Sequence, residues 1–164
     1  MRKGKDILPD SRCTDWADEL DAKEAWNTCP RGDWMLWAVN KLTRPKDITE
    51  NNYQWLRQLT LAKAYCANTI RYLMKDIRST NKIDVAIQFG LGNATIEELR
   101  TADAAADTAD TADVAYIAAD VAYFAAYTAA ADAAAAVAAE IKNQLETADI
   151  CRKYLTILIE QFYK

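Results

Sequence analysis

Two short stretches of the sequence carry residues that could bind a small ligand. Arg31 and Asp33 stand at a turn before a predicted helix, and Trp34 and Trp37 follow on that helix, one turn apart. Arg152 belongs to the last predicted helix. A tryptophan pair offers ring faces for stacking, and an arginine and a carboxylate at its rim can orient a polar group. If the helices bundle, these residues could converge on one pocket.

The same residues also have a purely structural interpretation. Buried tryptophans can anchor two helices, and Arg31 or Arg152 can pair with Asp33 or Asp149 within the chain. Such an arrangement needs no ligand. The sequence alone leaves both interpretations open.

A second candidate surface lies on the alanine-rich tract Thr101–Glu140, which contains neither Gly nor Pro. Alanine is the best helix former, so the tract predicts a helix roughly 60 Å long. One stripe of this helix is apolar and predicts a core-facing side: Val114, Ile117, Val121 and Phe124. Another strip carries polar tips: Asp113, Tyr116, Asp120, Tyr123 and Tyr127. That strip could bind a partner, or its tyrosines could pack against a neighbouring helix.

The residue types that the chain lacks narrow its chemistry. It contains no histidine, and its four cysteines, Cys13, Cys29, Cys66 and Cys151, are widely spaced. This composition excludes Ser/His/Asp and Cys/His catalysis and most metal sites. We therefore expect a protein that is not an enzyme and has no cofactor or metal, with its cysteines as buried thiols.

Charge is divided unevenly along the chain, whose formal net charge is −4. Residues 1–90 carry 15 Lys and Arg against 12 Asp and Glu, whereas residues 91–164 carry 5 against 12. The acidic second half suits a basic partner and argues against DNA. No apolar run is long enough to cross a bilayer and no signal peptide is recognisable, so we expect no membrane association and a cytoplasmic location.

The elements that must position these residues are all predicted to be helices, because no stretch has the alternation of a strand. The pattern predicts a helix from Thr14 or Asp15 to the Cys29–Gly32 turn, a buried helix over 33–42 capped by Asp33, a long helix from Asp47 or Thr49 to Arg78, a short helix over 81–89 and an amphipathic C-terminal helix over 141–162. The long helix would carry a basic face: Arg57, Lys63, Arg71, Lys75 and Arg78. A capping box at Thr95–Glu98, after the Gly90–Asn93 turn, would start the tract helix.

The expected fold is a single-domain, all-α helical bundle over residues 13–164, preceded by a flexible segment over 1–12. The tract either forms a spine, continuous with the C-terminal helix, or bends into an antiparallel pair. Its flat alanine face is also compatible with a homo-oligomer.

Three segments together resemble one protein family. They are CPRGDWMLW at 29–37, ATIEELR at 94–100 leading into the alanine-rich tract, and ADICRKY at 148–154. In order and spacing they resemble the Imm-5-like immunity proteins of bacteria and their phages, from Trp26 onward. The resemblance implies a small, all-helical, non-enzymatic protein that neutralises a target by binding it. The TADAAADTADTAD start of the tract is more acidic than this family leads us to expect.

Two functions follow as hypotheses. In the first, an immunity-type or phage counter-defence protein occludes a basic toxin or defence effector, using acidic residues such as Asp103, Asp107 and Asp110. In the second, the bundle sequesters a nucleotide-like signalling molecule. The residues that would stack its base are Trp34, Trp37, Tyr116 and Tyr123, and those that would bind its phosphate are Arg31, Arg71, Arg100 or Arg152.

Overall fold

The computed structural model describes residues 20–46, 49, 53–74, 76–106 and 133–163. Within these ranges the chain forms six α-helices and two short 3₁₀ helices, and no strand. The prediction of an all-α helical bundle is confirmed. The predicted flexible segment 1–12 and any bend in the tract lie outside the described residues. The predicted start of the first helix at Thr14 or Asp15 was wrong, because the helix that ends at the Cys29–Gly32 turn begins at Ala22, and the Asp21 side chain caps it by accepting from the Glu24 backbone N–H.

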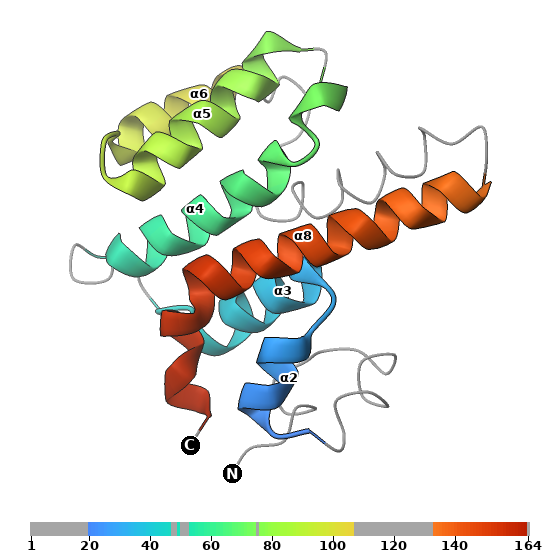
Figure 1. Ribbon diagram of the computed structural model, residues 1–164. Helices are drawn as coiled ribbons and strands as arrows, with labels where there is room; N and C mark the ends of the chain where they lie inside the picture. The colour runs from blue at the N-terminus through green and yellow to red at the C-terminus, as the bar shows by residue number, and fades with distance from the viewer. Residues whose placement is uncertain (1–19, 47–48, 50–52, 75, 107–132, 164) are drawn as a thin grey trace.

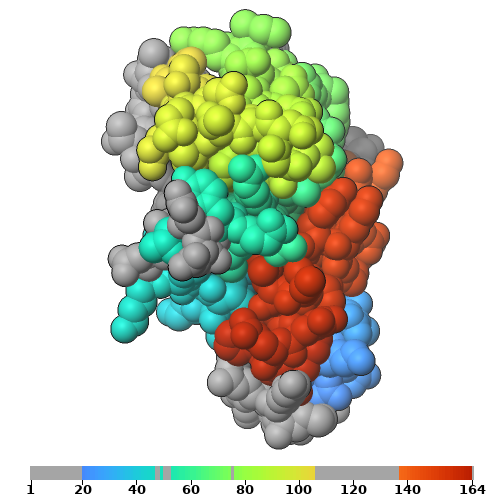
Figure 2. Space-filling model, turned by 90° about the vertical axis from the view of Figure 1, so that its left-hand side faces the viewer, coloured from blue at the N-terminus to red at the C-terminus, as the bar shows by residue number. Residues whose placement is uncertain are grey.

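The helices form a stack in which α4 has the central place. Their bounds are α2 Ala22–Thr28, α3 Gly32–Thr43, α4 Tyr53–Asn68, η3 Arg71–Leu73, α5 Ile77–Leu91, α6 Ile96–Ala106, α8 Ala133–Ile159 and η4 Glu160–Phe162. Helix α4 packs on α5 and on α8, while α6 packs on α5 and α3 packs on α8 (Figure 1). Figure 2 shows α5 and α6 at one end of the molecule and α2 with the end of α8 towards the other.

Apolar side chains of α2, α3, α4 and α8 form the main core. Trp26 on α2 is the largest fully buried side chain, and it packs with Met35 and Val39 of α3 and Leu155 and Ile159 of α8. Burying each large apolar side chain stabilises the fold by about 1.5–3 kcal/mol. The core therefore holds the N-terminal helices against the C-terminal one.

Phe89 of α5 is fully buried and contacts Arg57 of α4. Arg57 of α4 donates from Nη1 to the Phe89 carbonyl oxygen at 2.6 Å, and its guanidinium lies 4.9 Å from the centre of the Phe89 ring. Helix α5 ends at Gly92, whose φ of 90° is a left-handed conformation that favours glycine. Arg57 thus bonds one of the last carbonyls of α5 and links that end of the helix to α4.

The predicted start of α3 was wrong in one detail. The N-cap is Arg31, not Asp33, and Asp33 lies in the first turn. Its carboxylate pairs with the Arg31 side chain, and a negative charge in the first turn also complements the helix dipole. The end of the preceding helix at the Cys29–Gly32 turn is confirmed, since α2 ends at Thr28.

The predicted long helix to Arg78 was also wrong, because α4 ends at Asn68. The Thr69 hydroxyl donates to the Cys66 carbonyl at 2.7 Å, and Asp76 begins a new helix by accepting from the Arg78 backbone N–H at 2.8 Å. Polar side chains that bond the backbone locally compete with a continuous helix. The predicted basic face is therefore divided. Arg57 and Lys63 lie on α4, Arg71 in η3 and Arg78 on α5, while Lys75 lies outside the described residues.

The predicted capping box at the start of α6 is confirmed. Glu98 N–H donates to the Thr95 hydroxyl at 3.2 Å, and Thr95 N–H donates back to the Glu98 carboxylate at 2.7 Å. These two reciprocal bonds satisfy backbone donors that a helix start leaves open. The predicted continuity of the tract with the C-terminal helix is confirmed from Ala133 onward, since α8 runs without a break to Ile159.

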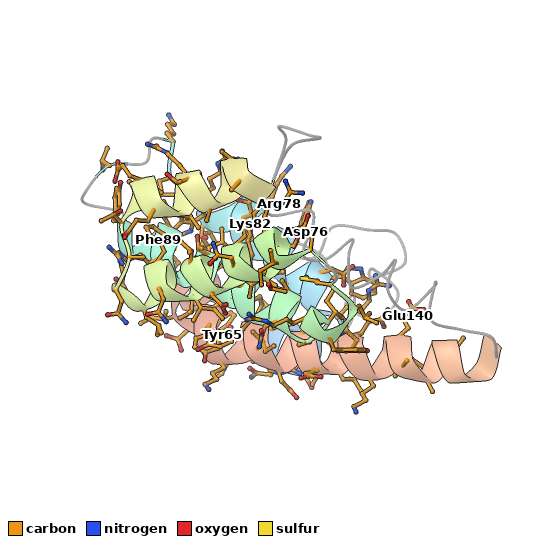
Figure 3. The ribbon with its side chains drawn as sticks, turned by 90° about the horizontal axis from the view of Figure 1, so that it is seen from above. Tyr65, Asp76, Arg78, Lys82, Phe89 and Glu140 are labelled. Atoms are coloured by element: carbon orange, nitrogen blue, oxygen red, sulfur yellow. The ribbon has the colours of Figure 1, made fainter. Side chains whose placement is uncertain are left out.

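The cap at Asp76 makes a testable prediction about pH. Hydrogen bonds from the Arg78 guanidinium and backbone N–H lower the pKa of Asp76 to about 2 (Figure 3). A lowered folded-state pKa means that the carboxylate stabilises the fold above its unfolded pKa, about 3.9, and that this stabilisation is lost as the pH falls towards about 2. Asp76→Asn keeps a capping side chain but removes the titration.

The measurement is urea unfolding of both forms between about pH 5 and about pH 2. We expect the stability advantage of the wild type over Asp76→Asn to shrink across that interval. Glu24→Gln, on a different helix, controls for a general loss of negative charge. Parallel pH curves for wild type and Asp76→Asn would contradict the role assigned to this cap.

Candidate functional site

The turn before α3 lies directly against the middle of α8. Arg152 donates from Nη1 to the Cys29 carbonyl oxygen at 2.8 Å, and the Cys151 thiol lies 3.5 Å from the Gly32 carbonyl oxygen. A Cβ on Gly32 would lie 2.6 Å from three atoms of Thr147. We call this contact the α3–α8 joint, formed by Cys29, Gly32, Thr147, Cys151 and Arg152. The joint brings together the CPRGDWMLW and ADICRKY segments.

The two arginines predicted for a pocket are both engaged by carboxylates of the same chain. Arg31 makes a two-point pair with Asp33, with Nε–Oδ1 at 3.0 Å and Nη2–Oδ2 at 2.6 Å. Arg152 pairs through Nη2 with Asp149 Oδ1 at 2.7 Å. These are the pairs that the purely structural interpretation of the sequence predicted, without a ligand. Two-point guanidinium–carboxylate pairs are among the stronger hydrogen bonds in proteins, so Arg31 is held firmly in place.

The two tryptophans predicted to stack a ligand have cations of the same chain on their rings. The Arg31 guanidinium lies 4.7 Å from the centre of the Trp34 ring, and the Lys41 ammonium lies 5.6 Å from that of Trp37. Both rings are half-buried and pack against the main core. Arg31, Asp33 and Trp34 therefore form one cluster at the start of α3, and Trp37 continues it by one turn.

Tyr154, in the ADICRKY segment, lies at the seam between α4 and α8. Its ring stacks on that of Tyr65 with centres 5.0 Å apart and planes 11° apart. Burial and a hydrogen bond between the two phenols raise the pKa of Tyr65. Lys153 lies 5.0 Å from the Tyr154 ring centre. This aromatic pair joins α4 to α8.

Of the remaining predicted site residues, those that the structure describes are not brought to this cluster. Arg100 lies on α6, towards the other end of the molecule, where it is exposed and 3.9 Å from Glu97 (Figure 1). Arg71 pairs with Asp84 of α5, and Asp103 of α6 pairs with Lys82 of α5. The predicted strip of the tract lies outside the described residues: Asp113, Tyr116, Asp120, Tyr123 and Tyr127.

One surface that the sequence analysis missed lies on the first turns of α8. Val137, Ile141 and Leu145 are 55%, 52% and 46% exposed, and we call these three residues the α8 stripe. Ile141 and Leu145 belong to the C-terminal helix over 141–162, which the sequence pattern predicted to be amphipathic. Further along the same face, Ala148, Cys151 and Leu155 are buried, because α3 and α4 cover them. Helix α8 continues past the start of α3, and Figure 3 shows this projecting part, with Glu140 on it.

Two further observations concern the described part of the chain. Among the residues that the structure describes, no group of three or more Cys, Asp or Glu side chains is placed to hold a metal ion. No helix in the described ranges is long and apolar enough to span a membrane.

Comparisons with known proteins add nothing to this picture. No protein-family model, no curated protein and no solved structure matches the chain.

Proposed function

We propose that this chain is a non-enzymatic, immunity-type or phage counter-defence protein that neutralises a basic toxin or defence effector by binding it. The observation that carries the proposal is the α8 stripe. The apolar face of α8 that α3 and α4 bury continues onto projecting turns, where its side chains are about half exposed. An exposed apolar row rimmed by polar residues is typical of a protein–protein contact.

The charge of the chain supports a basic partner. The α8 stripe belongs to the half of the chain that carries 5 Lys and Arg against 12 Asp and Glu, and Glu140 and Glu146 stand beside it in the sequence. Complementary charge speeds encounter with a basic surface, and the apolar row then supplies the buried contact. The resemblance to Imm-5-like immunity proteins points to the same class of function.

The arrangement at the start of α3 gives less support to sequestration of a nucleotide-like molecule. A phosphate would have to displace Asp33 from Arg31 or Asp149 from Arg152. A base stacking on Trp34 would compete with the Arg31 guanidinium for the ring. The described residues therefore favour a protein partner over a small anionic one.

The test compares wild type with the double variant Ile141→Ser/Leu145→Ser. Tagged protein is used to capture partners from cells that carry its gene, and the affinity of each captured protein is then measured. We expect roughly 100-fold weaker binding by the double variant, because the contact loses two large apolar side chains at about 1.5 kcal/mol each. Binding by the wild type should also weaken as salt is added.

Ile157→Ser is the matched control, since Ile157 is 66% exposed at the other end of α8. It should bind as the wild type does. A captured protein that is toxic when expressed alone, and harmless when expressed with the wild type, would support neutralisation. A partner that binds the double variant equally well would refute the stripe as its contact. A retained nucleotide-sized mass in native mass spectrometry would instead favour sequestration.

A further inference from the structure

Two tyrosine rings from different helices lie face to face at the seam between α4 and α8. The ring of Tyr65 on α4 and the ring of Tyr154 on α8 have centres 5.0 Å apart and planes 11° apart, and Figure 3 labels Tyr65 at this seam. Both side chains are half-buried, and Tyr154 also packs against the main core. The two rings are therefore held together by packing while part of each remains open to solvent.

Other contacts on the same seam hold the two helices in register. Asn143 of α8 donates from Nδ2 to the Thr69 hydroxyl, just after the end of α4, at 2.8 Å. Between this bond and the tyrosine pair, the Thr147 carbonyl oxygen of α8 lies 3.8 Å from Cys66 Sγ on α4. Contacts at successive turns prevent one helix from sliding along the other, so the backbone keeps the two rings in their stack.

Stacked phenols are suited to one kind of oxidation. Nearly parallel rings at this separation overlap in an offset stack, with the edge of one ring over the other. When a phenol loses an electron and its proton, the unpaired electron is shared between the oxygen and the ring carbons, including those beside the hydroxyl, the ortho carbons. Two such radicals couple when they touch, and holding the reacting groups in contact favours coupling within the molecule over coupling between molecules.

We propose that Tyr65 and Tyr154 form an oxidative modification site, at which a one-electron oxidant joins the two rings by a carbon–carbon bond to give dityrosine. Each phenol gives one electron to the oxidant and its hydroxyl proton to water, which leaves two phenoxyl radicals. The radicals combine through one ortho carbon of each ring, and the two ortho hydrogens then move to the phenolic oxygens. The protein thus loses two electrons and two protons, and two equivalents of oxidant are each reduced by one electron. The finished bond lies in both ring planes, so the rings tilt out of the stack, and partial burial leaves them an open side for this movement.

The bond would connect parts of the chain that are far apart in the sequence. It would close a loop from Tyr65 to Tyr154 that contains α5 and α6. A covalent crosslink over a loop of this size restricts the unfolded chain, so the crosslinked protein should melt about 10 °C above the unlinked one. None of the α8-stripe residues takes part in the bond, so crosslinking is independent of partner binding through that stripe.

The experiment oxidises the dilute, full-length protein with tris(bipyridine)ruthenium(III), generated by light and persulfate. The mass of the linked monomer should be two hydrogen masses below that of the untreated chain, and peptide mapping should recover the peptide of Tyr65 joined to that of Tyr154. Tyr65→Phe and Tyr154→Phe keep a ring in the stack but remove the phenol, so each should lower the yield of linked monomer by about tenfold or more. Tyr72→Phe removes a tyrosine that is 81% exposed and should crosslink as the wild type does.

Far-ultraviolet circular dichroism should show that the phenylalanine variants keep the wild-type fold. The wild-type peptide map tests the proposal without any variant, because a bond between two other tyrosines, in place of the one between Tyr65 and Tyr154, would overturn it. A monomer that stays unlinked while Tyr72 in the same sample is oxidised would overturn it as well, since the oxidant would then have acted. So would a bond between Tyr65 and Tyr154 that is found only between two chains.

Discussion

Trp26→Ala is expected to lower the free energy of unfolding by about 4 kcal/mol, because it empties the largest buried site in the core. Trp26 is 0% exposed, and its indole N–H donates to the Thr156 hydroxyl of α8 at 3.0 Å. The substitution removes both the packing and this hydrogen bond. Urea unfolding followed by circular dichroism measures the change, since it does not depend on the fluorescence of the removed tryptophan.

Two other variants separate the contribution of the packing of Trp26 from that of its hydrogen bond. Trp26→Phe keeps most of the ring volume but leaves the Thr156 hydroxyl without its donor, so its loss should be smaller. Trp37→Ala removes a half-buried tryptophan and should also cost less than Trp26→Ala. Equal losses for Trp26→Ala and Trp37→Ala would show that the core is not centred on Trp26.

Gly32→Ala is expected to cost about 3 kcal/mol, because the added methyl group would overlap α8. The nearest atoms are the Thr147 carbonyl carbon, Cβ and Oγ1, all 2.6 Å from the position of the new Cβ. The carbonyl carbon is backbone and cannot rotate away as a side chain can. The α3–α8 joint must therefore separate or shift, and thermal unfolding of Gly32→Ala should show a melting temperature several degrees lower.

The double variant Gly32→Ala/Thr147→Gly tests the cause of this loss. Removing the Thr147 side chain takes away two of the three overlapping atoms, so part of the stability should return although a glycine inside a helix is itself unfavourable. A strictly additive double variant would argue that Gly32→Ala acts through the local backbone and not through the contact with α8.

The ends of the helices were predicted well where a capping box or a turn marks the end in the sequence. They were predicted poorly where the apolar spacing continues beyond the end of the helix. The capping box at Thr95, the Gly90–Asn93 turn and the helix end at the Cys29–Gly32 turn were all predicted correctly. The helix break after Asn68 was missed because Ile70, Leu73 and Ile77 continue the apolar rhythm of α4. In the structure Ile70 is buried but Ile77 is 79% exposed, so the spacing of apolar residues no longer indicates core positions there.

The pairs within the candidate site that join residues close in sequence could be predicted, but the contacts between distant segments could not. The pairing of Arg31 with Asp33 and of Arg152 with Asp149 follows from residues two or three positions apart. The contact of Cys29 with Arg152 spans 123 positions and depends on tertiary packing. The exposure of Ile141 and Leu145 depends on where α3 begins relative to α8, which no pattern within α8 can reveal.

The α3–α8 joint also determines the order in which the chain can fold as it is made. Helices α4, α5 and α6 follow one another and pack on their neighbours, so they need only short loops to close. The contacts of Trp26 with Thr156 and of Gly32 with Cys151 span 130 and 119 positions. A ribosome must therefore synthesise nearly all of the chain before α2 and α3 can cover their apolar faces. Until then Trp26 and Met35 are available to chaperones.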